Sequence, residues 1–406
     1  MFGVPISTRP RGGPLACVLG DIDLVRPLGL GGIRCAVVAP RESSLAHSRY
    51  TERILPFEGM GEDDLVEALV RFGRGEAQPP VLYFEEDDHL LMVSRHRHRL
   101  AKAFHFILPD AGLIEQLVDK ARFQRLAQAL ALPVPRARVL RPGPGSLPPD
   151  LNLRYPMVVK PLVRRESWAA IERGGKAVRI DGEGDLHALW PQLIAAGIDL
   201  IAQELIPGPE SGIESYHVYV DERGEVAGEF TGRKIRTSPA VYGHSTALTV
   251  TDIRGQAADV AAIGREVAAR IGLRGVAKFD FKRAPDGRLY LLEINARFNL
   301  WHHLGAVAGV NLPALVHADL TGRERPLAAV ARPGRCWCRP SQDRLAAREA
   351  GLSTLAWLAW VARCEAGPLH WDDPMPFLKP RLRRVMHPLM RLWPGVRDDP
   401  QAAVKT

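Results

Sequence analysis

The sequence predicts an α/β protein whose chain begins with a parallel sheet and ends with helices. Near the amino terminus, short apolar runs alternate with helical segments, as in a βαβ unit. Further along, two apolar strands meet at Asp286-Gly287, a dipeptide that favours a tight hairpin turn. The length of 406 residues allows two or three domains and a sizeable core.

Composition and charge exclude several classes of protein. Hydrophobic residues make up 46% and charged residues 25%, as in an ordinary globular chain. The net charge of +8 would attract polyanions. Much of this excess lies in the clusters at 95–102 and 379–391, without a zinc finger or a basic-aromatic stripe. We therefore expect no nucleic-acid partner.

The same composition favours a cytoplasmic protein. The amino terminus lacks a charged start followed by a long apolar core, so no signal peptide is expected. The most apolar late stretch, Leu352–Ala362, is about half the length that spans a bilayer. Five scattered cysteines are interpreted as reduced structural thiols.

The first 84 residues predict a parallel sheet with helices between its strands. The acidic run Glu85–Asp88 follows the last of these strands. Open α/β sheets bind ligands at the carboxyl ends of their strands, whereas a solvated acidic loop is the alternative. The strands are expected at Leu15–Gly20, Ile33–Ala39 and Val81–Phe84, and the helices at Leu24–Gly31 and Leu65–Phe72.

The middle of the chain alternates between helices and strands after one long helix. That helix is expected at Leu113–Leu130, and a Pro- and Gly-rich loop at Arg141–Pro149 marks a subdomain boundary. Further helices are expected at Asp185–Ala196 and Asp252–Ile271. The strands are expected at Met157–Pro161, Ala177–Ile180, Leu200–Leu205, Tyr216–Val220, Val226–Gly232, Gly275–Lys282 and Leu291–Arg297.

The last two of these strands form the most informative feature, a hairpin with a polar end. Alternation places Glu293, Asn295 and Arg297 on one face, and Asp280 can lie opposite them on the partner strand. Carboxylate and amide oxygens suit Mg²⁺, and a guanidinium can stabilise phosphoryl charge. The alternative is a hairpin with a solvated polar face.

Earlier motifs add groups that suit a nucleotide. Lys120 follows Asp119 at a helix start, and Lys160 ends an apolar strand. Two lysines can neutralise phosphate charge. The segment Gln203–Gly208 ends another strand and turns, so its backbone can face adenine, and a carboxylate soon afterwards can bind ribose.

In this order the motifs resemble the ATP-grasp superfamily, especially its carboxylate–amine ligase branch. The resemblance covers residues 15–325, and its most specific parts are Pro156–Pro161, Gln203–Gly208 and Leu292–Arg297. It implies a Rossmann-like domain at 1–115, a two-subdomain ATP-grasp body at 116–328 with a lid at 133–205, and a small helical extension at 329–406.

The resemblance also implies a role for each motif residue. ATP phosphates or adenine would contact Lys120 and Lys160. Adenine would lie at Gln203 and the backbone of Glu204, Leu205 and Ile206, and ribose at Glu210, with Glu214 as the competitor. Phosphate or a carboxylate would contact Arg233 and Lys234. Mg²⁺, with Mn²⁺ as a substitute, would bind Asp280, Glu293 and Asn295, and the catalytic residues would be Lys278 and Arg297.

Several of these residues have plainer interpretations. Lys120 can be a surface lysine, Glu210 and Glu214 ordinary loop carboxylates, and Arg233, Lys234 and Arg236 a solvated charge run. Trp301-His302-His303 could line an acceptor pocket; alternatively, Trp301 packs in the core and the histidines are polar residues at a helix N-terminus. His244 suggests a substrate-side loop. One departure from the family is the lack of an early glycine-rich loop after Lys160; Arg164, Arg165 or Lys176 could replace its contacts.

The expected function is ATP- and Mg²⁺-dependent joining of a small carboxylate to an amine through an acyl phosphate. Phosphoryl transfer without ligation is a third option. The alternative from another class is a nucleotide-binding adaptor docked on a membrane through the basic, apolar segment Pro376–Trp393, which could instead pack on the body of the protein. A homodimer is also expected from the resemblance.

Overall fold

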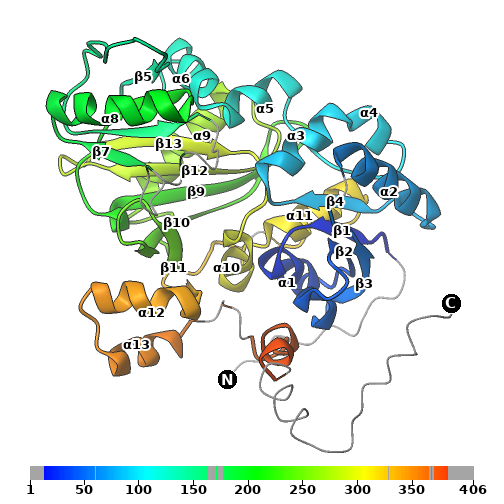
Figure 1. Ribbon diagram of the computed structural model, residues 1–406. Coiled ribbons are helices and arrows are strands. Elements are labelled where there is room, and N and C mark those ends of the chain that lie inside the picture. Colours follow the sequence, from blue (N-terminus) through cyan, green and yellow to red (C-terminus); the bar gives the residue numbers. More distant parts are fainter. Residues whose placement is uncertain are drawn as a thin grey trace, which may run out of the picture.

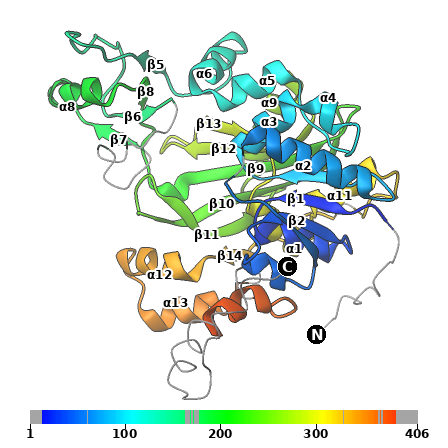
Figure 2. The same ribbon diagram turned by 45° about the vertical axis from the view of Figure 1, so that its right-hand side comes forward.

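The computed structural model describes residues 13–59, 61–162, 168, 171, 177–327, 329–364, 367 and 370–382. These residues form three sheets with helices packed on them (Figure 1). The N-terminal unit and the lid lie on either side of the central sheet, and the last helices extend from the lower end of the molecule (Figure 2).

The N-terminal unit confirms the predicted parallel sheet. Its strand order is β3-β2-β1-β4, and every neighbouring pair is parallel. Strand β3 was not predicted, because it is a half-exposed edge strand with charges in place of an apolar run. The elements are β1 (Ala16–Leu19), α1 (Ile22–Leu30), β2 (Cys35–Ala39), η1 (Ser44–His47), β3 (Thr51–Pro56), α2 (Glu62–Gly75), β4 (Val81–Phe84), α3 (Asp87–Arg95) and α4 (Arg97–Leu100).

The predicted helix 113–130 is wrong as a single element. It divides into α5 (Ala111–Val118) and α6 (Lys120–Ala129). Asp119 between them is extended, with a ψ of 116°, and its carboxylate accepts a hydrogen bond from the Arg122 amide at 2.8 Å. Asp119 is therefore an N-cap, and Lys120 opens a new helix.

The lid is a four-stranded antiparallel sheet with its own core. The strand order is β5-β8-β6-β7. Met157, Trp190 and Leu200 are among the side chains of a cluster separate from the other two cores. The elements are β5 (Ala137–Leu140), β6 (Met157–Pro161), β7 (Val178–Ile180), α8 (Glu183–Ala196) and β8 (Leu200–Glu204), of which only β5 was not predicted.

The central sheet has six antiparallel strands in the order β13-β12-β9-β10-β11-β14. Both predicted hairpins are present, and their turn glycines, Gly224 and Gly287, have φ values of +90° and +85°. The elements are η2 (Glu210–Gly212), β9 (Ile213–Val220), β10 (Val226–Ser238), β11 (His244–Thr251), α9 (Ala258–Arg270), β12 (Gly275–Arg283), β13 (Leu289–Asn295), α10 (Trp301–Ala308), α11 (Leu312–Leu320) and β14 (Cys336–Cys338).

Helix α9 begins later than the predicted Asp252. The Asp252 carboxylate accepts a hydrogen bond from the Arg254 amide at 3.0 Å, and residues 253–257 form turns. An aspartate that bonds the amide two residues ahead favours a turn over a helix. The helix therefore starts only at Ala258.

The two faces of the central sheet belong to different cores. Tyr216, Phe279 and Leu291 pack in one cluster, and Phe230 and Trp301 in another. A bulge in β13 sets this division, because Asp280 pairs with Glu293 whereas the next residue, Phe281, pairs with Leu291. The extra residue lets Leu291 stay buried while Glu293 faces Asp280's side of the sheet.

The carboxyl-terminal part is helical, as predicted, but one strand of it joins the central sheet. Strand β14 pairs with β11. Helices α12 (Pro340–Glu349) and α13 (Thr354–Val361) follow, and residues 375–382 are also helical. No helix among the described residues is long and apolar enough to cross a bilayer. The rest of the predicted amphipathic segment, from residue 383 on, lies outside the described residues.

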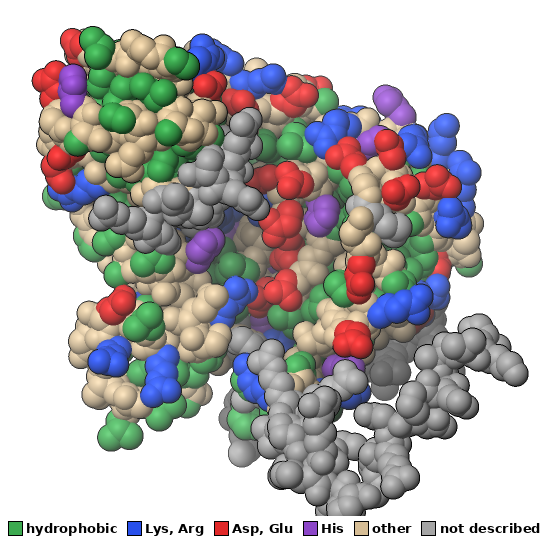
Figure 3. All heavy atoms as spheres, viewed as in Figure 1, with side chains coloured by type: hydrophobic (Ala, Val, Ile, Leu, Met, Phe, Trp, Pro, Cys, Tyr) green, Lys and Arg blue, Asp and Glu red, His purple; other side chains and the backbone are tan. Residues whose placement is uncertain are grey.

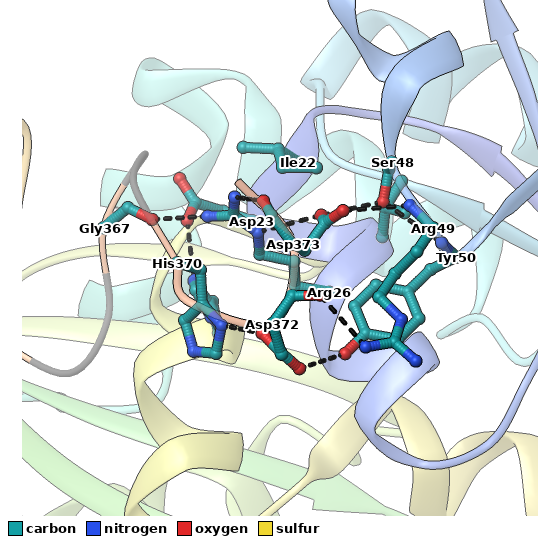
Figure 4. Close-up of polar contacts among 12 residues, drawn as sticks. Ile22, Asp23, Arg26, Ser48, Arg49, Tyr50, Gly367, His370, Asp372 and Asp373 are labelled. Atoms are coloured by element: carbon teal, nitrogen blue, oxygen red, sulfur yellow. Dashed lines mark hydrogen bonds and ion pairs between the residues drawn. The ribbon is translucent and has the colours of Figure 1, made fainter. Parts of the chain in front are cut away.

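The carboxyl-terminal residues return to the N-terminal unit through a network of polar contacts (Figure 4). Arg26, which is 1% exposed, donates to Asp373 Oδ2 at 3.3 Å and to the Asp373 carbonyl at 2.9 Å. The Ser48 hydroxyl donates to the same carboxylate at 2.8 Å, and the Tyr50 hydroxyl donates to Asp372. This network, which we call the clasp, joins α1 and the residues between η1 and β3 to a segment more than 300 residues away in sequence.

Candidate active site

One face of the central sheet gathers most of the predicted polar residues. Across β9, β12 and β13, Ser215 pairs with Asp280, and Asp280 pairs with Glu293. Paired residues of an antiparallel sheet share a face. Lys278 pairs in turn with Asn295, two residues from Asp280, so it lies on the same face. Figure 3 shows acidic side chains gathered in a hollow between the lid and the N-terminal unit.

Asp280 is a buried carboxylate on this face, with a polar contact to each of its two oxygens. It is 3% exposed, and Ser215 donates to its Oδ1 at 2.5 Å. Lys278 Nζ lies 2.7 Å from its Oδ2. Burial would raise the pKa of the Asp280 carboxyl, but Lys278 and Lys234 outweigh burial and hold that pKa below its ordinary value. Asp280 is therefore a carboxylate at neutral pH.

Glu293 and Asn295 stand at the open side of the same cluster. The Glu293 side chain is 59% exposed, and Asn295 Nδ2 donates to its Oε1 at 3.1 Å. Lys278 Nζ lies 4.0 Å from the same oxygen. The ammonium group thus lies between two carboxylates, whose charges outweigh burial and raise the pKa of Lys278.

Two further lysines lie near this face, Lys160 at the end of β6 in the lid and Lys120 at the start of α6. Lys160 Nζ donates to Gln203 Oε1 at 3.3 Å, and Lys120 Nζ donates to the Leu162 carbonyl at 2.8 Å. Burial lowers the pKa of Lys160, Glu293 opposes the shift, and Lys120 adds to it. Lys160 therefore lies within electrostatic reach of both Lys120 and the carboxylate cluster, as a phosphate-binding lysine would.

The last two residues of β8, Gln203 and Glu204, have different partners. Glu204 is 5% exposed, and Arg154 donates to its carboxylate through three bonds at 2.8–3.2 Å. Its amide donates to the Arg136 carbonyl, and the Leu205 amide donates to the Pro156 carbonyl, both within 3.0 Å. The Glu204 side chain thus anchors the lid, whereas Gln203 faces Lys160.

Glu210 and Glu214 have different partners. Arg283 binds both oxygens of Glu214, at 2.5 and 3.1 Å, and also binds Asp259 of α9. Glu210 lies 3.7 Å from Lys282 Nζ. Because Glu214 pairs with Phe281, it lies on the face opposite Asp280. The geometry therefore favours Glu210 over Glu214 as the ribose carboxylate.

The predicted basic run of β10 divides between two sides of the sheet. Arg233 pairs with Glu214 and so faces away from Asp280. Lys234, one residue on, faces Asp280, and its charge lowers the pKa of that carboxyl. Only Lys234 of this pair is on the candidate site's face.

Arg236 is not part of a solvated charge run. Its guanidinium donates to both oxygens of Asp343, at 2.8 and 2.6 Å, and lies 4.2 Å from the centre of the Trp360 ring. Asp343 is fully buried and also accepts from Thr246 and Trp357. The ion pair between Arg236 and Asp343 could not be predicted from the sequence, because the two residues are 107 positions apart.

Arg297 connects the hairpin to the N-terminal unit. It follows β13, and its Nε donates to Asp87 Oδ1 at 2.5 Å at the start of α3. Burial would lower the pKa of the guanidinium, but Asp87 raises it overall. Asp87 belongs to the predicted acidic run, so that run faces the polar end of the hairpin.

The acidic run also contains a buried carboxyl. Glu85 is 8% exposed and accepts a hydrogen bond from the Asp21 amide at 2.5 Å. A Cβ atom on Gly20 would lie 2.5 Å from the Glu85 carboxylate, so only glycine leaves room there. Burial raises the pKa of Glu85 to about 8. The run is therefore not simply a solvated loop.

Trp301, His302 and His303 pack in the core and do not line an acceptor pocket. They are at most 2% exposed, and His303 Nδ1 lies 3.2 Å from Asp23 Oδ1. Core packing, the alternative predicted for Trp301, is confirmed; the two histidines lie in the first turn of α10, as their own alternative predicted, and are buried as well. Burial lowers the pKa of His302 to about 4.

Sequence reasoning missed His217, which lies next to the cluster. Its Cα pairs with that of Lys278, and its ring stacks on Phe230 with centroids 4.4 Å apart. Both ring nitrogens are buried without a hydrogen-bond partner among the described residues, and burial keeps the pKa of His217 well below its usual value. His217 lies two residues after Ser215, the partner of Asp280, on the same strand. The alternation of side chains along that strand therefore predicts that His217 shares the face of Asp280.

The described residues fit a magnesium site made of oxygen ligands. No three His, Cys, Asp or Glu side chains in this part of the chain lie close enough to hold a metal ion by themselves. The predicted set instead has two carboxylates and an amide, which suits Mg²⁺ because that ion keeps waters and phosphate oxygens as ligands. The proposed substitutes for a glycine-rich loop, Arg164, Arg165 and Lys176, lie outside the described residues.

Comparisons with known proteins show similarity to ATP-grasp proteins and ATP-dependent ligases. A family described as "ATP-grasp in the biosynthetic pathway with Ter operon" matches residues 199–335. The D-aspartate ligase of Enterococcus faecium (strain Aus0004) is 24% identical over 293 residues, which cover 68% of either chain. The D-alanine–D-alanine ligase of Neisseria meningitidis serogroup B (strain ATCC BAA-335 / MC58) is 28% identical over 216 residues, 50% of this chain and 65% of that enzyme.

A solved structure shows the same fold. The L-amino acid ligase from Bacillus licheniformis superposes with a TM-score of 0.59 at 16% identity, over 80% of this chain and 79% of that one. The range matched by the family contains the residues from Gln203 to Arg297, with the whole hairpin, but not Lys120 or Lys160.

Proposed function

We propose that this chain is an ATP-dependent C–N ligase of the ATP-grasp superfamily, which joins a small carboxylate to an amine through an acyl phosphate. The family match and the ligase relatives support this proposal. The products would be the amide, ADP and phosphate. The observation that carries this proposal is the cluster of Lys278, Asp280, Glu293 and Asn295 on one face of the sheet, within electrostatic reach of Lys160 in the lid.

The nucleotide would lie between the lid and the central sheet. Lys120 and Lys160 would bind its phosphates, Gln203 and the backbone of 204–206 its adenine, and Glu210 its ribose. The separate core of the lid supports closure as a unit, which would keep water from a hydrolysable acyl phosphate.

The carboxylate cluster would hold the metal. Asp280 supplies a deprotonated oxygen, and Glu293 and Asn295 supply oxygens at the open side. When bound there, magnesium would neutralise phosphate charge and polarise the γ-phosphoryl group. Lys278, which lies between the two carboxylates, would then be released toward the phosphates. Mn²⁺ is the substitute that the same ligands would accept.

The remaining cations would stabilise charge during transfer. A substrate carboxylate attacks the γ-phosphate, its oxygen forms the new O–P bond, and ADP leaves. Lys234 and Arg297 lie at opposite ends of the cluster and would stabilise the spreading negative charge. The amine then attacks the acyl carbon, phosphate leaves, and the amine loses a proton.

The relatives suggest amino acids as the first substrates to test. The names D-aspartate ligase and L-amino acid ligase describe enzymes whose substrates carry both a carboxylate and an amine. The acidic run that faces Arg297 would suit the ammonium group of such a substrate. We expect the protein to act in the cytoplasm, where ATP is available.

The test is release of ADP and phosphate from ATP and Mg²⁺ over pooled amino acids and small carboxylates. The wild type should turn over only with a particular carboxylate–amine pair, and Glu293→Gln should lose at least about 100-fold in kcat. Glu266→Gln is the matched control, since that carboxylate is 63% exposed on α9, away from the cluster. Unchanged turnover in Glu293→Gln would contradict the metal assignment. Phosphate release without an amide product would instead identify phosphoryl transfer without ligation.

A further inference from the structure

The carboxyl-terminal end of the described chain exposes an unusual share of apolar side chains. Fifteen large hydrophobic side chains are exposed among the described residues, and seven of these lie between residues 345 and 382. They are Leu345 in α12, Leu355 and Leu358 in α13, Trp371, and three in the helical residues 375–382. We call this set the docking end. Concentrated apolar exposure of this kind marks an interaction surface.

Helix α13 has a fixed inner face and an open outer face. On the inner face, Trp357 is 8% exposed and its Nε1 donates to Asp343 at 2.9 Å, while Arg236 lies over the Trp360 ring. On the outer face, Leu355 is 79% exposed and Leu358 50%. The buried contacts therefore hold the helix so that its leucines point to solvent.

Trp371 is also held outward by fixed neighbours. Its side chain is 92% exposed. Asp372 and Asp373 on one side are bound by Tyr50, Ser48 and Arg26 in the clasp, and His370 on the other side bonds to Asp372 (Figure 4). The clasp thus presents a tryptophan to solvent on an anchored backbone. Tryptophan prefers the boundary between water and apolar phase.

The two parts of the docking end lie at the same end of the molecule. In Figure 1 and Figure 2, α13 and the red helical turn of residues 375–382 both lie at the lower side, away from the lid. The helices that carry these apolar side chains therefore lie at the far end of the molecule from the lid. A partner could bind there without blocking the candidate active site.

The charge around the docking end is strongly positive. Within the described residues 340–364 and 370–382, one exposed carboxylate, Glu349, accompanies five exposed cations. The other carboxylates there are buried or bonded within the protein. The cations are Arg344, Arg348, Arg363, Lys379 and Arg381.

We propose that this end docks the enzyme on an anionic membrane surface, with Leu355, Leu358 and Trp371 entering the headgroup boundary and the surrounding cations binding lipid phosphates. The combination of an apolar face, a boundary tryptophan and basic flanks is that of an interfacial anchor. A second copy of the chain is a poorer occupant. In a twofold dimer the patch would meet itself, which would bring the five cations of one copy against those of the other.

The test is flotation of the full-length protein with lipid vesicles. We expect it to bind vesicles that contain phosphatidylglycerol, to bind pure phosphatidylcholine weakly, and to dissociate at about 1 M salt, where the screening length falls to roughly 3 Å. The double variants Leu355→Glu/Leu358→Glu and Leu355→Ser/Leu358→Ser should each bind at least about tenfold more weakly. The serine pair excludes a mere effect of added negative charge.

Two matched controls keep the result specific. Leu147→Glu and Leu327→Glu alter side chains that are 81% and 98% exposed outside the docking end, so both should bind vesicles as the wild type does. No binding by the wild type at low salt, or equal binding by the double variants, would overturn the proposal. A dimer in light scattering that the double variants dissociate, without vesicle binding, would overturn it in favour of self-association.

Discussion

Replacing Glu85 by glutamine is expected to remove a pH-dependent loss of stability from the N-terminal unit. The Glu85 carboxyl lies buried at the end of β4, where it accepts a hydrogen bond from the Asp21 amide. Burial raises its pKa from the ordinary 4.5 to about 8. A glutamine side chain keeps the accepting oxygen and never ionises.

The direction of this pH dependence follows from the number of protons that the folded and the unfolded protein bind. Between about pH 4.5 and pH 8 the folded protein keeps a proton on Glu85 that the unfolded chain releases. The free energy of unfolding of the wild type therefore falls as pH rises, by about 1.4 kcal/mol per pH unit. From pH 6 to pH 8 the wild type should lose about 2 kcal/mol relative to Glu85→Gln, because the decline levels off near the folded-state pKa.

The assay is thermal unfolding of both proteins at several pH values between 6 and 8. The Tm of Glu85→Gln relative to the wild type should rise by roughly 4–8 °C across this range for a cooperative unit of 150–250 residues. A Tm difference that stays constant from pH 6 to pH 8 would refute the reasoning. It would mean that Glu85 ionises in the folded protein near its ordinary pKa.

Three further predictions concern the other polar contacts. Asp343→Ala should lower the free energy of unfolding by about 3–5 kcal/mol, since it leaves Arg236 buried without its partner; denaturant titration measures this, and a loss below about 1 kcal/mol would contradict it. Glu210→Gln should raise the KM for ATP several-fold with little loss of stability. Glu214→Gln should lower the Tm, because Glu214 binds Arg283, and should leave the KM near wild type. The reverse pattern would make Glu214 the ribose carboxylate in place of Glu210. Lys234→Ala should lower kcat/KM by about tenfold or more in steady-state kinetics, whereas Arg233→Ala on the opposite face should change it little. Equal effects of the two variants would contradict the assignment of Lys234 and Arg233 to opposite faces of β10.

Local patterns in the sequence predicted much of the fold. Apolar runs gave the positions of β1, β2, β4 and β6, and the dipeptide Asp286-Gly287 gave the hairpin turn. Strands without such runs were missed, as β3 shows, because an edge strand needs no buried face. The helix predicted at Leu113–Leu130 is interrupted at Asp119, whose side chain caps the helix that Lys120 begins, as the position of Lys120 at a helix start had indicated.

The candidate site was predictable as a set of residues but not as a geometry. Strand alternation found Asp280, Glu293 and Asn295, yet the bulge at Leu292, which lets Leu291 and Glu293 face opposite sides, leaves no mark in the residue types. Pairings across long sequence distances, such as Arg236 with Asp343, depend on tertiary packing. Periodicity along one segment cannot report them.

The most direct test of the account is to follow oxygen from the substrate carboxylate. Once the screen identifies a substrate pair, the carboxylate is labelled with ¹⁸O and the released phosphate is analysed by mass spectrometry. Transfer through an acyl phosphate predicts one ¹⁸O atom in each phosphate, because the carboxylate oxygen that attacks the γ-phosphate leaves with it. Phosphate that takes its new oxygen from labelled water instead would contradict a ligase that works through an acyl phosphate.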